Sequence, residues 1–208
     1  MARNKYPEKT VEKILTVARD LFFQKGYDQT TMQDIIDQGL SKGAIYHHFK
    51  SKKEIFDRMM VNLEQTVVPE MNQSQNACEQ LKQLLGQRLI DTTKINLLKK
   101  AQSLFEDPKV FGELYFLNMQ QTTQQVQQFI VAGNQDGSMH CEFPQETAEL
   151  VVQFFSIWIG TGLYTVTQTQ FERKVRYYQN LFHYFGVELL DEHLMDELNQ
   201  YYQKFTAV

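Results

Sequence analysis

The clearest structural signal in the chain is the segment Ser41-Lys42-Gly43-Ala44-Ile45-Tyr46-His47-His48-Phe49-Lys50. At 100° per residue, the apolar residues and His48 fall on one side of a short helix, and the lysines, Tyr46 and His47 fall on the other. Gly43 lies among the latter and would let another molecule approach the backbone closely. Lysine, tyrosine and histidine side chains bind phosphates and base edges, so this face favours contact with nucleic acid. The alternative is a basic surface helix without a ligand.

A second short helix is predicted just before this one. The polar segment Asp28–Thr31 is suited to cap a helix whose apolar residues lie within Met32–Ile36. Gly39 ends that helix after barely two turns, and Ser41 caps the next. Two short helices joined by a tight turn predict a helix-turn-helix whose second helix fits the major groove of DNA.

Two further helices flank this pair. An apolar stripe at helical spacing runs from Val11 to Phe22 and ends at Lys25-Gly26. Ser51-Lys52-Lys53-Glu54 has the capping-box pattern and opens a fourth helix. Three short helices and a longer one are therefore expected between residue 8 and about residue 68.

Beyond residue 69 the pattern changes to longer helices, and no segment alternates as a strand would. Helices are expected around 81–89 and 95–104, from Pro108 to about 130, from Pro144 to about Tyr164, and near Gln170–Phe185 and Asp191–Lys204, with a loop at Gly133–Gly137. The predicted fold is all-α with about nine or ten helices. A three-helix head, residues 1–52, is expected to precede a larger helical bundle, residues 53–208.

The charge is unevenly distributed along the 208 residues, whose net charge is −4. Residues 1–58 hold eleven Lys and Arg against eight Asp and Glu, a net charge of +3, so the remainder carries −7. A basic head on an acidic body favours a polyanionic partner at one end of the molecule.

Composition excludes several classes of protein. No run approaches 18 consecutive apolar residues, so no membrane segment is predicted. The first residues lack the apolar run of a secretory signal, and two cysteines are too few for a disulfide framework. We therefore expect a soluble cytoplasmic protein.

No catalytic, cofactor or metal site is predicted. His47 and His48 are adjacent on a helix and point about 100° apart, so they cannot share one ion. Cys78, His140 and Cys141 lack paired ligand spacing, and buried apolar cysteines are the expected state. The chain contains neither a GxSxG motif nor a glycine-rich phosphate loop after a strand. We expect a protein that is not an enzyme and has no cofactor.

Residues 8–60 resemble a known family. The matching motifs are Ala18–Phe22, Gly26-Tyr27, Thr30–Ile36, Gly39–Phe49 and Lys50–Phe56. With these offsets the segment resembles the DNA-binding head of the TetR family of one-component repressors. The rest of the chain resembles that family only in size and helical character.

The resemblance implies seven DNA-contacting positions. Thr31, at a helix N-terminus, would bind phosphate through its hydroxyl and backbone N–H groups. The helix after Ser41 would meet bases and backbone through Lys42, Gly43, Tyr46 and His47. Two further lysines, Lys50 and Lys52, would bind the flanking phosphates.

One departure from the family lies between the two short helices. The family usually has one residue more between Ile36 and Ser41 than this chain's Asp37-Gln38-Gly39-Leu40. Either the turn is tighter here or a residue is missing from the chain. Because the segment after the turn is intact, we expect the turn to absorb the difference.

Residues 151–164 form a segment that is apolar nearly all round and must be covered on most faces. The resemblance implies that this helix and the next form a four-helix homodimer interface with their two-fold mates. The interface residues expected are Phe154, Ile157, Thr161, Val175, Tyr178 and Phe182. The alternative is an internal core helix in a monomer.

An effector pocket is also implied by the resemblance. Its expected lining is Phe116, Met119, Phe155 and Trp158, and a pocket so lined would take a partly apolar small molecule. The alternative is that these residues form an ordinary core.

The function implied is a DNA-binding transcriptional regulator. It is expected to be a repressor that binds a palindromic operator in double-stranded DNA as a homodimer and is released by a small-molecule effector. One alternative is a TetR-like DNA-binding protein without a small-molecule effector, controlled by a protein partner. The other is a helical enzyme or scaffold, which the exposed face of the helix after Ser41 argues against.

Overall fold

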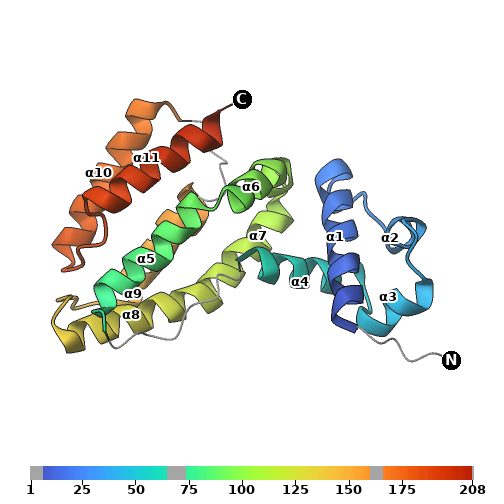
Figure 1. The fold of residues 1–208 in the computed structure, drawn as a ribbon, viewed down its shortest axis with the longest axis horizontal. Coiled ribbons are helices and arrows are strands. Elements are labelled where there is room, and N and C mark those ends of the chain that lie inside the picture. Colours follow the sequence, from blue (N-terminus) through green and yellow to red (C-terminus); the bar gives the residue numbers. More distant parts are fainter. Residues whose placement is uncertain (1–6, 65–73, 160–165, 208) are drawn as a thin grey trace. The chain divides into compact units, whose positions relative to one another are not determined.

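The computed structural model describes residues 7–64, 74–159 and 166–207, and all of the regular elements within these ranges are helices. The all-α fold class is confirmed. Backbone contacts divide the chain into two units (Figure 1). Unit 1 comprises Met1–Gln65 and Ser103–Leu114, and unit 2 comprises Thr66–Gln102 and Tyr115–Val208.

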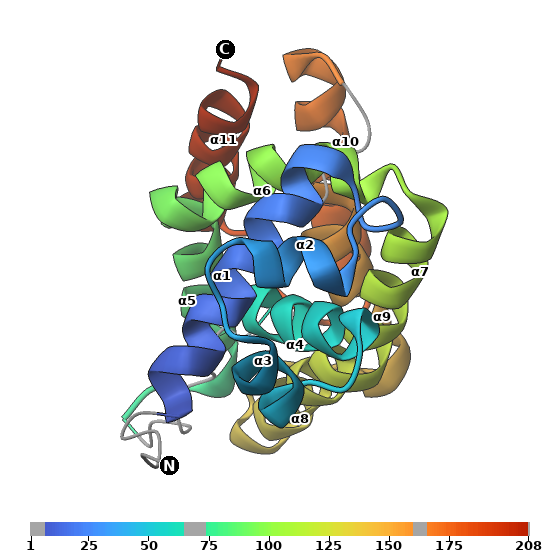
Figure 2. The ribbon, with the colours of Figure 1, turned by 90° about the vertical axis from the view of Figure 1, so that its right-hand side faces the viewer.

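Unit 1 contains the four N-terminal helices. They are α1 (Pro7–Lys25), α2 (Met32–Asp37), α3 (Lys42–His48) and α4 (Lys52–Glu64). The first helix contacts the other three, and Figure 2 views this unit with α2 and α3 toward the reader. Their apolar residues share one small core, which includes Ile14, Ala18, Phe22, Ile35, Ile45, Phe49, Ile55 and Phe56. Burying each large side chain contributes about 1.5–3 kcal/mol relative to leaving it exposed.

The turn between α2 and α3 is short and regular. Gly39 has φ +82°, a left-handed conformation that glycine adopts without strain. The carbonyl of Ile36 accepts the N–H groups of both Gly39 and Leu40 at 3.2 Å. The turn accommodates the short connection, and α3 remains a helix from Lys42 to His48.

Unit 2 contains the longer helices. These are α5 (Ala77–Ile90), α8 (Thr123–Asp136), α9 (Pro144–Val152), α10 (Gln168–Tyr184) and α11 (Glu192–Thr206), with the π-helices η1 (Asn118–Thr122) and η2 (Gln153–Ile159). Both α6 (Thr92–Phe105) and α7 (Pro108–Leu117) have residues in both units. The core forms where α8 packs against α9 and α5, and α5 against α11.

The number of helical segments agrees with the number predicted from the sequence, but one predicted loop does not form. Helices α7, η1 and α8 follow one another without a break, as do α9 and η2, so the described residues hold ten helical segments. The predicted loop at Gly133–Gly137 is wrong, because α8 continues to Asp136 and ends at Gly137, where φ is +79°. Gly133 lies inside α8, and a larger residue would not pack there, because an added Cβ would lie 2.7 Å from the Cγ of Met139.

Unit 1 extends beyond the domain boundary predicted between residues 52 and 53. Helix α4 stays with α1 because Phe56 packs edge-on against Phe22, with 5.6 Å between the ring centroids. That residues 1–52 form the DNA-binding domain stays a prediction. Among the described helices, none is long and apolar enough to cross a bilayer.

Gly186 gives a test of the packing in unit 2. Its φ is +75°, and an added Cβ would lie 2.2 Å from the carbonyl oxygen of His140. Gly186→Ala should therefore lower the free energy of unfolding by about 2–4 kcal/mol. The transition can be followed in urea by the fluorescence of Trp158, the single tryptophan of the chain.

Gly112→Ala is the matched control, because a Cβ at this helical position would meet nothing within 4 Å. It should be neutral or stabilising by up to about 1 kcal/mol. Equal unfolding midpoints for Gly186→Ala and the wild type would contradict the packing described for Gly186.

Candidate nucleic-acid interface

Helix α3 is held in place by its two ends and by its apolar side. The Ser41 hydroxyl accepts the N–H of Ala44 at 3.1 Å, and the N–H of Phe49 donates to the carbonyl of Ile45 at 2.8 Å. Ile45 is fully buried and Phe49 is nearly so. Because these two side chains lie in the core of unit 1, the rotation of α3 about its axis is fixed.

The opposite face of α3 is the exposed one. Lys42, Gly43, His47 and Lys50 are exposed, and Tyr46 is 46% exposed despite its size. A Cβ on Gly43 would meet nothing within 4 Å, so the space above the backbone is open. The structure thus brings together five of the seven predicted DNA-contacting residues on one small surface, which we call the α3 face.

The two histidines differ as expected. His47 is exposed and His48 is half-buried, and their rings meet edge-on with centroids 4.9 Å apart. Within the described part of the chain, no group of three or more His, Cys, Asp or Glu is placed to hold a metal ion. The cysteines Cys78 and Cys141 are both free and buried.

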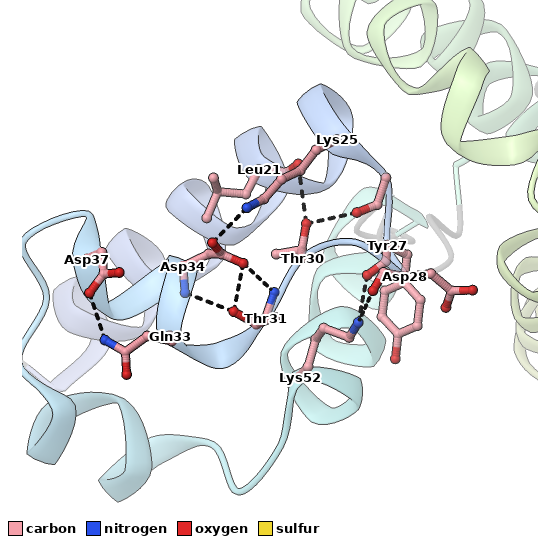
Figure 3. Close-up of polar contacts among 11 residues, drawn as sticks. Leu21, Lys25, Tyr27, Asp28, Thr30, Thr31, Gln33, Asp34, Asp37 and Lys52 are labelled. Carbon is pink, nitrogen blue, oxygen red and sulfur yellow. Dashed lines mark hydrogen bonds and ion pairs between the residues drawn. The ribbon is translucent and has the colours of Figure 1, made fainter.

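Thr31 has its hydrogen-bond donors engaged within the protein. It is the N-cap of α2, and both its backbone N–H and its hydroxyl donate to Oδ2 of Asp34 at 2.7 Å (Figure 3). In return, the backbone N–H of Asp34 donates to the Thr31 hydroxyl at 3.1 Å. A phosphate would have to displace a carboxylate to reach these donors, so the predicted phosphate contact of Thr31 stays a prediction.

Asp34 also ties α2 to the end of α1. Its Oδ1 lies 2.7 Å from the ammonium of Lys25. The ammonium of Lys25 and then the donors of Thr31 hold the pKa of Asp34 well below its ordinary value of 3.8. The sequence predicts Thr31 near the cap of α2. It does not predict the ion pair of Lys25 with Asp34, because a lysine at this position also fits the basic last turn of α1.

Lys52 lies away from the α3 face. Its ammonium donates to the carbonyls of Tyr27 and Asp28, at 2.7 and 3.3 Å, and sits 4.3 Å from the centre of the Tyr27 ring (Figure 3). The side chain is half-buried and holds the α1–α2 turn against the start of α4. Its partners are more than twenty residues away, so no local pattern could have revealed this contact.

The N-terminus of α4 has a variant of the predicted capping box. The Ser51 hydroxyl accepts the N–H of Glu54 at 3.2 Å. The Glu54 carboxylate reaches the backbone N–H of Lys50 at 2.7 Å, one residue before the cap. This contact fixes the backbone of Lys50, whose side chain remains exposed.

The predicted effector residues are only partly together. Phe155 is buried in the core of unit 2, and Met119 and Trp158 are half-buried against it. Phe116 is 62% exposed and contacts the ring of Tyr115, with centroids 6.0 Å apart. Three of the four residues thus belong to or pack against the core of unit 2, and Phe116 lies at the surface. That they line an effector pocket stays a prediction.

Three of the six predicted dimer residues are buried within the chain. Phe154, Val175 and Phe182 are each at most 3% exposed, and the Phe154 ring stacks on that of Tyr178 with centroids 4.5 Å apart. Side chains so buried offer no surface to a second copy, so the structure assigns these three to the core. Ile157 and Tyr178 are half-buried, and Thr161 lies outside the described residues.

Other residues of α10, a helix predicted from the sequence to form an interface, are exposed. Tyr177 and Tyr184 are 62% and 81% exposed, and the Lys174 ammonium sits 3.8 Å from the ring centre of Trp158. The apolar stripe of α10 was interpreted as an interface, although a regular stripe also fits a core. The exposed aromatic side chains of α10 were not singled out from the sequence.

The segment that contains the helix-turn-helix matches a known protein family. Residues 14–59 match the family described as bacterial regulatory proteins, tetR family. The biofilm operon icaADBC HTH-type negative transcriptional regulator IcaR of Staphylococcus aureus is 30% identical over 110 residues, 50% of this chain and 59% of IcaR. The uncharacterized HTH-type transcriptional regulator YfiR of Bacillus subtilis is 36% identical over 56 residues, 26% of this chain and 27% of YfiR. The chain thus spans less than two thirds of the length of either relative.

Solved structures resemble the whole chain in fold. Salmonella enterica GusR superposes with a TM-score of 0.62 at 14% identity, covering 98% of both chains. A bacterial regulatory protein in the tetR family from Rhodococcus RHA1 gives 0.54 at 20% identity, covering 86% of this chain and 98% of that one. At identities of 14% and 20%, this similarity shows a shared fold alone.

The Asp34 contacts predict a pH dependence of the stability of unit 1. Because the pKa of Asp34 is lowered in the folded state, its contribution is fully present above its ordinary value of 3.8. The contribution declines below that value and is lost as the pH falls through the lowered pKa of the folded state. Asp34→Asn should lower the unfolding midpoint in urea at pH 6, and the difference from the wild type should shrink by pH 3. Far-UV circular dichroism would follow the transition.

Asp37→Asn, at the other end of α2, is the control. It removes an exposed carboxylate that accepts from Gln33 at 2.7 Å and leaves the cap intact. A difference between Asp34→Asn and the wild type that is as large at pH 3 as at pH 6 would contradict the charged cap.

Proposed function

The chain belongs to the tetR family of bacterial regulatory proteins, and on this premise we propose that it is a DNA-binding transcriptional regulator that acts as a repressor. The observation that carries the proposal is the α3 face, where two lysines, a tyrosine and a histidine are exposed around an open Gly43. Repression is supported by the name of IcaR, which is a negative transcriptional regulator. A role in gene regulation implies a cytoplasmic location.

The chemistry of the α3 face suits the major groove. Lys42 and Lys50 stand near the two ends of α3 and can neutralise phosphates on either side of the groove. Tyr46 and His47 lie between them and can bind phosphate or base edges, while Gly43 allows close approach of the DNA. Lys52 serves this surface indirectly, by holding the α1–α2 turn.

A homodimer on a palindromic operator follows from the size of the α3 face. A helix of seven residues offers few contacts, whereas two copies related by a two-fold axis would read two half-sites about 34 Å apart. We place the dimer contact on α10 and η2, through the exposed Tyr177 and Tyr184 of α10 and the half-buried Ile157 of η2. Tyrosine is enriched at such interfaces because its ring is apolar and its hydroxyl is polar.

Release by a partly apolar small molecule is the proposed regulation. Phe155, Met119 and Trp158 share one core, and two π-helical segments lie beside it, since α9 contacts η1 and runs directly into η2. Such π-helical turns are frequent at functional sites. Among the residues that the structure describes, the buried hydroxyl of Ser156 in η2 has no hydrogen-bond partner, which suits a ligand that supplies one.

A second candidate is control by a protein partner in place of a small molecule. The exposed aromatic pair Tyr115 and Phe116 favours it, since large exposed aromatic side chains are typical of protein contacts. A thermal-shift screen with apolar small molecules separates the two candidates. Stabilisation of unit 2 by a hit, lost in Phe155→Ala, supports the effector.

DNA binding can be measured by fluorescence anisotropy with the DNA upstream of the protein's own gene and a scrambled duplex. The wild type should bind the upstream DNA at least about tenfold more tightly, and Lys42→Ala/Tyr46→Ala should lose that preference. Raising the salt from about 50 to about 200 mM should weaken binding by about a thousandfold if six phosphates are contacted.

Lys100→Ala, an exposed lysine on α6, is the charge-matched control and should bind as the wild type does. Wild-type protein that is folded yet binds neither duplex at low salt would contradict the proposed function. Loss of binding in Lys100→Ala equal to that in the double variant would show that net charge, not the α3 face, is responsible.

The dimer contact predicts a change of mass in solution. By light scattering the wild type should have twice the chain mass of 24.5 kDa, and Tyr177→Asp should shift it toward the single-chain value. Phe143→Asp, which changes another exposed aromatic residue of unit 2, should remain dimeric. Dimers of equal stability in both variants would exclude this side of α10 as the interface.

A further inference from the structure

One long helical surface of unit 2 carries no charged side chain. The last residues of α7, then η1 and α8, follow one another without a break, and from Tyr115 to Gln135 they include no Lys, Arg, Asp, Glu or His. Charged residues make up 22% of the whole chain, so their absence sets this surface apart. Its exposed residues are Tyr115, Phe116, Gln120, Gln121, Gln124, Gln125, Gln128, Val131, Asn134 and Gln135.

A line of these exposed residues, spaced three or four apart, runs along one side of the helix. We call this line the α8 stripe; it consists of Phe116, Gln120, Gln124, Gln128, Val131 and Gln135. The π-helical turn η1 keeps the line straight, because such a turn holds more residues than an α-helical turn and brings positions four apart closer to alignment. The opposite side of α8 is fixed in the core of unit 2 by Val126, Phe129 and Ile130.

The α8 stripe is complementary to itself when two copies run antiparallel. A two-fold axis near residue 126 would place Gln124 of one copy opposite Gln128 of the second, because the two positions are equally far from the axis. A carboxamide both donates and accepts, so two facing glutamines can satisfy each other. The outer positions pair in the same way: 116 with 135 and 120 with 131.

We propose that the α8 stripe is a self-association surface, on which a second copy of this chain packs antiparallel. The chain after residue 58 carries a net charge of −7, so two copies of unit 2 repel each other over most approaches. At the stripe two helices can meet without facing like charges. The exposed side chains of Phe116 and Val131 would be covered there. This inference goes beyond the proposed function and depends neither on DNA binding nor on the α10 contact.

The size of the α8 stripe sets the strength of the contact. From residue 116 to residue 135 the stripe is about 29 Å long, and a helix is about 10 Å wide. Two copies would therefore bury about 600 Å² together, roughly half of what the smallest standard interfaces bury. A contact of this size is weak, so we expect association at about 0.1–1 mM chain.

The test is sedimentation equilibrium of the full chain from about 5 µM to about 0.5 mM, in about 150 mM salt. The average mass of the wild type should rise over the upper part of this range. Gln124→Glu/Gln128→Glu puts like charges opposite each other across the axis, at exposed positions where the fold is unaffected. It should weaken the association by about twofold to thirtyfold.

Gln83→Glu/Gln87→Glu is the matched control. It makes the same two changes at the same spacing, on exposed positions of α5, and should associate as the wild type does. Equal weakening in both variants would show that net charge is responsible and would overturn the stripe. A wild-type mass that stays constant up to about 0.5 mM would overturn it as well.

A mixture of complementary variants tests whether the occupant is a second copy. Gln124→Lys/Gln128→Lys alone should associate weakly, but mixed in equal amounts with Gln124→Glu/Gln128→Glu it should associate at least as strongly as the wild type. A mixture no stronger than its components would overturn contact between two copies of the stripe.

Failure of the α10 contact would be recognised separately. In that case Tyr177→Asp leaves the mass at about 5 µM unchanged, while the response to the paired charges at about 0.5 mM persists and supports the stripe. If both contacts are correct, Tyr177→Asp should approach twice the single-chain mass at the highest concentration. Adding Gln124→Glu/Gln128→Glu to that variant should return it toward one chain.

Discussion

The polar groups of the α1–α2 turn constrain the rest of unit 1, because they lie against a very small core and must find partners. Gly26 ends α1 with φ +83°, and its carbonyl accepts the hydroxyl of the fully buried Thr30 at 2.8 Å. The carbonyls of Tyr27 and Asp28 are taken by Lys52. A buried polar group left unpaired costs about 1–3 kcal/mol, so the bond of the buried Thr30 hydroxyl favours this conformation of the turn.

That conformation sets the direction in which α2 begins, and through the short Gly39 turn it sets the place of α3. The apolar side of α3 fixes its rotation, and the side left exposed carries Lys42, Tyr46 and His47. The chemistry of the proposed DNA contact thus depends also on residues outside the α3 face. Lys52 is the clearest case, since its ammonium holds the turn. Its predicted phosphate contact stays a prediction.

Local signals in the sequence predicted the helix-turn-helix well, because caps and helical spacing involve residues three or four positions apart. Ser41, Thr31 and the two faces of α3 are of this kind. Contacts distant in sequence could not be predicted in the same way. The apolar residues Phe154 and Phe182 have the pattern of an interface and of a core alike, and only the packing of η2 against α10 decides for the core. No residue pattern marked the change to π-helix at Asn118.

The central claim, that the α3 face contacts DNA, is tested most directly by photo-crosslinking. A benzophenone amino acid replaces His47 in one variant and the exposed Phe143 of unit 2 in another, and each is irradiated with the upstream duplex. The account predicts crosslinks from position 47 to bases or sugars within two half-sites, competed by unlabelled upstream DNA, and none from position 143. Crosslinks of equal yield from both positions, or from position 143 alone, would contradict it.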